Sequence, residues 1–111
     1  KARLEMISGK EDIKTVLLKL SNWLNISDDS LCVWGNGVAM DNVILKCAFD
    51  KAKIKVPWSY KNDKCYRTVK NMFSEIRLER EGTHHNALDD AISQVKHLIK
   101  INNSLKINQI Y

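Results

Sequence analysis

Several features of membrane, secreted or multidomain proteins are missing from this sequence of 111 residues. A single proline and four glycines leave no room for a long flexible linker. No apolar run reaches the about 20 residues that a membrane-spanning helix needs, and no segment resembles a signal peptide. Three widely spaced cysteines form neither a CxxC pair nor a disulfide-rich pattern, which indicates a reducing, cytoplasmic location. The sequence therefore predicts one small domain, without a membrane partner.

The composition is that of a folded protein with a modestly basic surface. Hydrophobic residues make up 44% of the chain and charged residues 28%. Eighteen Lys and Arg against 13 Asp and Glu give a formal net charge of +5. This excess suits a polyanionic partner, and it suits an ordinary basic surface in water equally well.

The spacing of apolar residues predicts four helices and one or two short strands. Helices are expected over residues 9–24, 39–52 and 85–101, the first with Ser8 and Glu11 as a capping box. The apolar run LCVW at residues 31–34 predicts a buried strand, which the turn GNG follows. Residues 64–73 are interpreted as a brief extended piece that runs into a helix, and residues 102–111 as a tail that frays. A strand that leads through a glycine turn into a helix is typical of α/β proteins.

Each of the three longer helices carries an apolar stripe that should face a core. The buried strand, by contrast, needs neighbours, because a lone strand leaves its backbone N–H and C=O groups unpaired. Those neighbours would come from upstream of Lys1 or from another chain, unless the strand prediction is wrong. The expected stripes are Ile13, Val16, Leu17, Leu20 and Leu24; Ile44, Leu45, Ala48, Phe49 and Ala52; and Leu88, Ala91, Ile92, Val95, Leu98 and Ile99.

Two aspartates and a histidine stand at the starts of predicted helices. Asp41 follows the strand and the glycine turn, and His85 and Asp90 open the last helix. Taken singly, each is explained by helix capping or by the helix dipole. Taken together, two carboxylates can bind hard cations such as Mg²⁺ or Mn²⁺, and a histidine can take a proton from an attacking water. Metal-assisted phosphodiester hydrolysis requires this combination.

The segments WGNGVAMDNVILKCAFD and HHNALDDA resemble the DEDDh 3′–5′ exonucleases, in particular the RNase T-like enzymes of phages and prophages. The second motif of that family is an Asn, a short spacer, an aromatic residue and Asp. It is matched by residues 36–41, with Met40 where Phe is common. The third motif, His-x-Ala-x-x-Asp, is matched by residues 85–90. The resemblance covers the chain from about Leu17 to Ile101.

This resemblance implies an α/β fold of the RNase H-like type. Residues 1–111 would be its C-terminal part, a single partial domain dominated by helices with one or two short strands. The implied activity is metal-dependent hydrolysis at single-stranded 3′ ends of nucleic acid with two divalent ions, Mg²⁺ or Mn²⁺. Asp90 and Asp41 would bind the metal ions, and His85 would be the general base. The neighbouring residues His84 and Asp89 match no required position.

The first motif of the family, Asp-x-Glu on an opening strand, is absent from the sequence. Glu5 precedes the first helix, but no Asp stands two residues before it. Asp41 and Asp90 therefore cannot assemble a two-ion site alone. We expect a C-terminal portion of an exonuclease domain, completed by a missing N-terminal segment or a second chain. The alternative is an inactive, truncated prophage-type remnant that serves as a structural or interaction module.

Aromatic and basic residues between positions 34 and 73 could form a path for a single strand, with stacked bases and paired phosphates. Packing in the core and the loops explains the same residues. A zinc site of Cys32, Cys47, Cys65 and a histidine has no supporting spacing. The aromatic candidates are Trp34, Trp58, Tyr60, Tyr66 and Phe73, and the basic ones are Lys61, Lys64 and Arg67. The residues selected as candidates for contact with nucleic acid are Asn36, Trp34 and Arg67.

Overall fold

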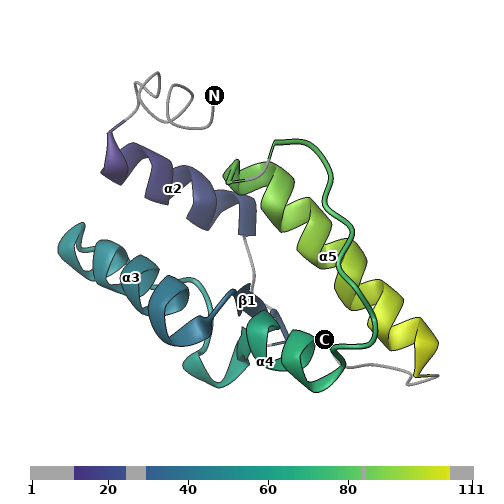
Figure 1. The fold of residues 1–111 in the computed structure, drawn as a ribbon. Coiled ribbons are helices and arrows are strands. Elements are labelled where there is room, and N and C mark those ends of the chain that lie inside the picture. Colours follow the sequence, from purple (N-terminus) through teal and green to yellow (C-terminus); the bar gives the residue numbers. More distant parts are fainter. Residues whose placement is uncertain (1–11, 25–29, 84, 106–111) are drawn as a thin grey trace. The chain divides into compact units, whose positions relative to one another are not determined.

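The computed structural model describes residues 12–24, 30–83 and 85–105 (Figure 1). These residues fall into two compact units, one of residues 12–24 and 30–67 and one of residues 68–83 and 85–105. None of the described helices is long and apolar enough to cross a membrane. The elements are α2 (Ile13–Leu24), β1 (Val33–Gly35), α3 (Val38–Lys51), the 3₁₀ turn η1 (Tyr60–Asn62), β2 (Asp63–Cys65), α4 (Tyr66–Met72) and α5 (Ala87–Ser104).

Helix α2 begins at Ile13, four residues later than predicted, because Asp12 caps it. The Asp12 carboxylate accepts a hydrogen bond of 2.7 Å from the backbone N of Thr15, which satisfies one of the free N–H groups of the first turn. This hydrogen bond holds the pKa of Asp12 below its usual value. The predicted capping box of Ser8 and Glu11 lies outside the described residues.

The core of the first unit lies between α2, α3 and the loop after α3. Leu17, Phe49 and Trp58 are buried there, and the Phe49 and Trp58 rings meet edge to face with centroids 6.0 Å apart. Burial of each such side chain contributes about 1.5–3 kcal/mol. Trp58, expected in a loop, is thus a core residue, and half-buried apolar side chains surround the cluster: Leu20, Leu24, Leu31, Val33, Leu45, Ala48, Ala52, Ile54 and Val56.

The predicted strand is present as β1, shifted by two residues, and it pairs in parallel with β2. The extended piece predicted near residue 64 therefore supplies a neighbour for one edge of β1. Because side chains alternate along a strand, Val33 and its partner Asp63 share the face toward α3. Trp34 and its partner Lys64 share the opposite face. Trp34 is half-buried and not part of the core cluster.

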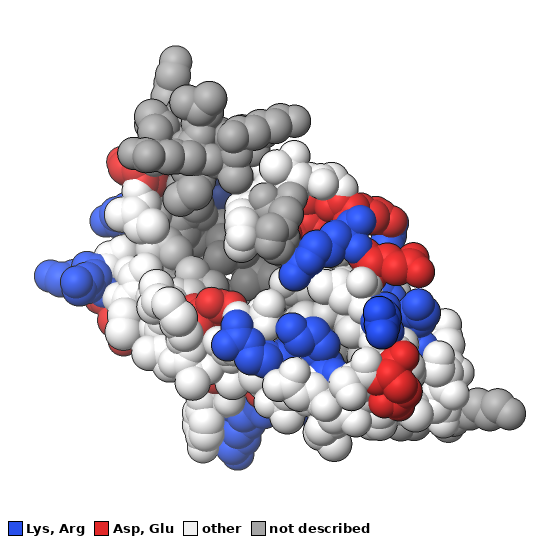
Figure 2. All heavy atoms as spheres, in the orientation of Figure 1, with Lys and Arg blue, Asp and Glu red and all other residues white. Residues whose placement is uncertain are grey.

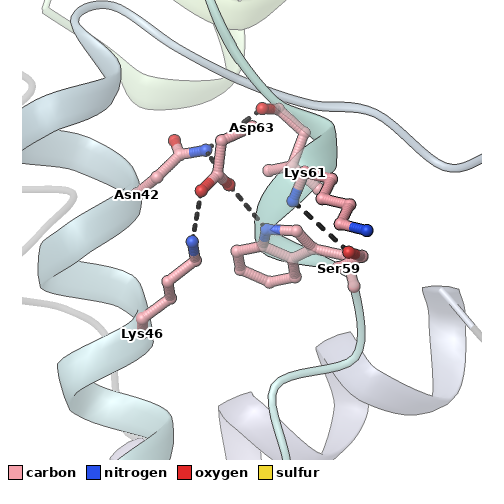
Figure 3. A network of polar contacts seen from close by, with 7 residues as sticks. Asn42, Lys46, Ser59, Lys61 and Asp63 are labelled. Carbon is pink, nitrogen blue, oxygen red and sulfur yellow. Dashed lines mark hydrogen bonds and ion pairs between the residues drawn. The ribbon is translucent and has the colours of Figure 1, made fainter.

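A network of polar contacts joins α3 to both strands (Figure 3). The Asp63 carboxylate accepts hydrogen bonds from Nδ2 of Asn42 at 3.0 Å and from Nε1 of Trp58 at 2.8 Å, and it forms an ion pair with Lys46. The buried Asn42 amide also donates to the backbone O of Val33 at 3.1 Å. One aspartate thus links β2, the helix and the core tryptophan, and Asn42 extends the link to β1.

Gly35 allows α3 to lie against the end of β1. A Cβ atom at this position would lie 2.5 Å from Oδ1 of Asn42 and 3.1 Å from Cβ of Asp41. Any larger residue would push the helix away from the strand. The glycine therefore belongs to the same arrangement as the Asp63 network.

The second unit consists of the end of α4, the segment that follows it and α5. The segment runs alongside α5 without forming a helix or strand, as predicted for the charged stretch IRLEREG (Figure 1). Helix α5 confirms the last predicted helix, although it starts at Ala87 and extends to Ser104. It thus includes residues 102–104, which were expected to fray, and residues 106–111 lie outside the described residues.

The predicted apolar stripe of α5 is wrong in most of its positions. Leu98 is buried, but Leu88 and Val95 are 68% and 54% exposed. The buried face is a different row, which includes polar side chains, because the segment beside α5 presents backbone groups that need hydrogen-bond partners. Of the other stripes, Ile13, Val16 and Ile44 are also exposed. The buried row of α5 comprises Ser93, His97, Leu98, Ile101 and Asn102.

Replacement of Asp63 by Ala should lower the free energy of unfolding by about 2–3 kcal/mol. The change leaves the donors of Asn42, Trp58 and Lys46 without their shared acceptor, and hydrogen bonds to a charged group are worth about 1.5–3 kcal/mol. Urea unfolding followed by tryptophan fluorescence measures the loss. Asp50→Ala, an exposed aspartate on α3, is the control and should stay within about 0.5 kcal/mol of the original protein. Equal stability of both variants would show that the network contributes nothing.

Acid should remove the contribution of Asp63. Partial burial raises the pKa of this carboxyl, but the hydrogen bonds from Lys46, Asn42 and Trp58 and the charge of Lys46 outweigh burial, so its pKa lies below 3.8. A depressed folded-state pKa stabilises the protein above the pKa of the unfolded chain, and this stabilisation is lost as the pH falls through the folded pKa. Unfolding curves of the original protein and of Asp63→Asn should therefore differ most above pH 3.8 and converge below it. A constant difference down to the acid limit would contradict this assignment.

Candidate functional site

The turn between β1 and α3 carries the first predicted metal ligand. Asp41 is exposed in the first turn of α3, where the positive end of the helix stabilises a carboxylate. Its Oδ2 accepts a hydrogen bond of 2.8 Å from the backbone N of Asn36. Its Oδ1 accepts no hydrogen bond from the part of the chain that the structure describes. Asp41 therefore fixes the turn with one of its two carboxylate oxygens.

Arg67, at the start of α4, binds the same turn. Its Nε donates to Oδ1 of Asn36 and its Nη2 donates to the backbone O of Asn36, both at 3.2 Å. The side chain and both backbone groups of Asn36 are thereby engaged by Arg67 and Asp41. The structure thus brings together three of the predicted site residues, Asn36, Asp41 and Arg67.

The remaining nucleic-acid candidates differ in how accessible they are. Trp34 lies on β1 two residues before Asn36, half-buried, beside Lys64 on the face away from α3. Tyr60 is 73% exposed, whereas Tyr66 and Trp58 are buried at 1% and 8% exposure and cannot stack on a base. Trp34 and Tyr60 therefore keep accessible ring surface, and Trp34 lies on the strand that leads into the turn.

The start of α5 carries the other two candidates. His85 is exposed in the turn before the helix, with a backbone φ of 67°, in the left-handed region. Asn86 caps the helix, since its Oδ1 accepts from the backbone N of Asp89 at 3.1 Å. Asp90 follows in the first turn, and its Oδ1 lies 3.8 Å from Nη1 of Arg80. His85 and Asp90 are therefore held by a single helix start.

The structure gives Asp89 a definite role at this turn. Its Oδ2 accepts a hydrogen bond of 2.7 Å from the backbone N of Thr83. The side chain also occupies the space that a Cβ atom at Gly82 would need. Sequence reasoning treated Asp89 as a partner of the helix dipole. The available signal was the spacing of Asn86 and Asp89, because an acidic residue three positions after a capping residue often binds a backbone N–H at the helix start.

The two groups of candidates belong to different units. Asp41 lies in the first unit, and His85 and Asp90 lie in the second. Among the residues that the structure describes, no group of three or more His, Cys, Asp or Glu side chains could hold a metal ion. The same finding rules out the zinc site considered for the three cysteines, which are all free and of which Cys47 is exposed. Each unit therefore carries one of the two candidate carboxylates.

Sequence reasoning missed the Asp63 network completely. Asp63 follows an Asn in a loop-like stretch, and its partners Asn42 and Trp58 lie 21 and 5 positions away. The one available signal was the four-residue spacing of Asn42 and Lys46, which places both on one face of α3. The network orients the helix whose first turn carries Asp41.

Comparison with known proteins supplies the identity of the domain. A model of the Rv2179c-like 3′-5′ exoribonuclease domain matches residues 1–102. No curated protein and no solved structure matches the chain. The matched residues include both candidate segments, the turn at Asn36–Asp41 and the helix start at His85–Asp90. The chain belongs to the 3′-5′ exoribonuclease Rv2179c-like domain family.

Proposed function

We propose that this chain carries two of the motifs of a metal-dependent 3′–5′ exonuclease that hydrolyses phosphodiester bonds at single-stranded ends. The family match over residues 1–102 is the observation that carries this proposal. We assign the domain to the DEDDh, RNase T-like group with an RNase H-like fold, because its two motifs stand in order at the starts of α3 and α5.

The donor set suits two Mg²⁺ or Mn²⁺ ions, which prefer oxygen ligands. Asp41 offers the carboxylate oxygen that its turn leaves unused, and Asp90 offers a carboxylate whose side chain is 26% exposed. Such ions would polarise the scissile phosphate and acidify the attacking water. His85, which is exposed in the turn before α5, would accept a proton from the attacking water. Arg80 balances the charge of Asp90 beside it.

Two carboxylates do not complete a two-ion centre. The sequence contains no Asp-x-Glu motif, and the described residues contain no cluster of three metal-ligating side chains. We therefore propose that further carboxylates come from outside these 111 residues. The alternative function, an inactive module, corresponds to a protein in which no such carboxylates are supplied.

The nucleic acid would approach along the turn at Asn36. Arg67 and Lys64 offer positive charge there, and the half-buried Trp34 offers a ring for stacking, which is worth about 1–3 kcal/mol per base. On the face shown in Figure 2, Lys and Arg side chains are interspersed with Asp and Glu side chains. Binding should therefore depend on local contacts at the 3′ end more than on the net charge of +5.

Replacement of His85 by Ala should lower kcat about 10²- to 10⁴-fold, the usual worth of a general base. The full-length protein is assayed on a 5′-labelled single-stranded RNA and on the matching DNA, with Mg²⁺, with Mn²⁺ and with EDTA. The label should appear in a ladder that shortens from the 3′ end, and a 3′-phosphate should block it.

His84→Ala is the matched control for this assay, because it removes the neighbouring imidazole, which matches no motif position. It should retain activity within about threefold, because the motif gives position 84 no role and most substitutions without such a role have small effects. Equal loss in both variants, or full activity of His85→Ala, would refute the role of His85. An original protein that is inactive with either metal would favour the inactive module.

A further inference from the structure

We propose that Asp89 is a positioning residue for His85, and that it acts by fastening residues 76–83, the strap segment, to α5. This inference rests on the proposed function, in which His85 is the general base. It concerns only residues of the second unit, all of which the structure describes. Asp89 occupies a variable position of the third motif, so the motif itself assigns it no role.

A hydrogen bond joins the side chain of Asp89 to the strap segment. Oδ2 of Asp89 accepts from the backbone N of Thr83 at 2.7 Å. The charge strengthens this bond, since hydrogen bonds to an ionised acceptor are about twice as strong as neutral ones. Thr83 stands two residues before His85. The end of the strap segment is thereby tied to the first turn of α5.

Gly82 provides the space for this contact. A Cβ atom there would collide with the carboxylate of Asp89, and the backbone φ of 69° disfavours any other residue. The close approach therefore depends on a glycine at position 82 and a carboxylate at position 89. Because the contact needs both residues, we regard it as a specific feature of this turn.

The remainder of the strap segment is fastened to the same helix, turn after turn. The backbone N of Glu81 donates to Oγ of the buried Ser93 at 2.9 Å, and Oγ of Ser93 donates to the backbone O of Asp89 at 2.9 Å. Nε2 of the buried His97 lies 2.6 Å from the backbone O of Ile76. Ion pairs reinforce these bonds on the surface: Lys96 with Glu81 at 2.8 Å and Lys100 with Glu79 at 3.7 Å.

His85 is consequently fixed from both sides along the chain. On its N-terminal side, Thr83 is bound to Asp89. On its C-terminal side, Asn86 caps α5 through the backbone N of the same Asp89, and its own backbone N donates to the O of Thr83 at 3.0 Å. The turn that these bonds close places His85 at a positive φ. Loss of Asp89 releases one side of this turn, and a displacement of about 1 Å is enough to cost 10²-fold in rate.

The test compares Asp89→Ala, Asp89→Asn and Gly82→Ala in the full-length protein, assayed on single-stranded RNA with Mg²⁺. Asp89→Ala should lower kcat about 10- to 100-fold with KM within about twofold, because the substrate is still bound while the base is misplaced. Asp89→Asn keeps a side-chain acceptor for the Thr83 N–H and should recover part of the rate. Gly82→Ala should reproduce the loss without removal of the carboxylate.

Ile101→Ala is the matched control, because Ile101 is a fully buried residue of α5 that does not touch the strap segment's hydrogen bonds. It destabilises the same helix, so it should lower the melting temperature at least as much as Asp89→Ala does while kcat stays near normal. Equal losses of kcat in both variants would show that Asp89 matters only for stability, and the proposal would fall.

A double variant separates this inference from the proposed function. If Asp89 acts through His85, Asp89→Ala should have no further effect on kcat in a His85→Ala background, since groups that act as a unit are not additive. If the kcat losses of the two single variants instead multiply in the double variant, Asp89 does not act through His85. The positioning role would then be overturned, while the role of His85 as the general base would stand. Full activity of His85→Ala alone would instead overturn the proposed function. Hydrogen exchange of the Thr83 backbone amide provides a readout that does not depend on activity. This exchange should be faster in Asp89→Ala than in Ile101→Ala.

Discussion

Both candidate segments depend on the same kind of hydrogen bond. A carboxylate in the first turn of a helix accepts from a backbone N–H five or six residues upstream, Asp41 from Asn36 and Asp89 from Thr83. Each bond folds the preceding turn back over a helix start, where the positive end of the helix stabilises the charge. The candidate residues are thus placed by backbone geometry, which is more rigid than contact between long side chains.

The surrounding structure in each unit serves to hold that helix start in place. In the first unit, Asp63 ties α3 to β2 and to Trp58, and Asn42 ties the same helix to β1. In the second unit, Ser93 and His97 bind the backbone of the strap segment from the buried face of α5. Buried polar groups with satisfied hydrogen bonds specify one arrangement of their elements, because any other leaves a donor or acceptor unpaired.

The sequence predicted the elements well and the faces of the helices less well. Periodicity located α2, α3 and α5, and the motifs located both helix starts. The stripe of Leu88, Val95 and Ile99 was expected in the core because apolar periodicity assumes an apolar neighbour. The neighbour of α5 is instead a segment of irregular backbone, which requires polar partners such as Ser93 and His97. Contacts between distant positions, such as Asn42 with Asp63, follow no local spacing rule.

The chain belongs to the Rv2179c-like 3′-5′ exoribonuclease family, and the central proposal is that Asp41 and Asp90 are each metal ligands in its activity. Titration of the full-length protein with Mn²⁺, followed by electron paramagnetic resonance, tests it most directly. The account predicts two bound ions, with Asp41→Asn and Asp90→Asn each weakening Mn²⁺ binding while Asp50→Asn, which replaces an exposed aspartate of α3 in the same way, does not. Unchanged Mn²⁺ binding in both variants would contradict it.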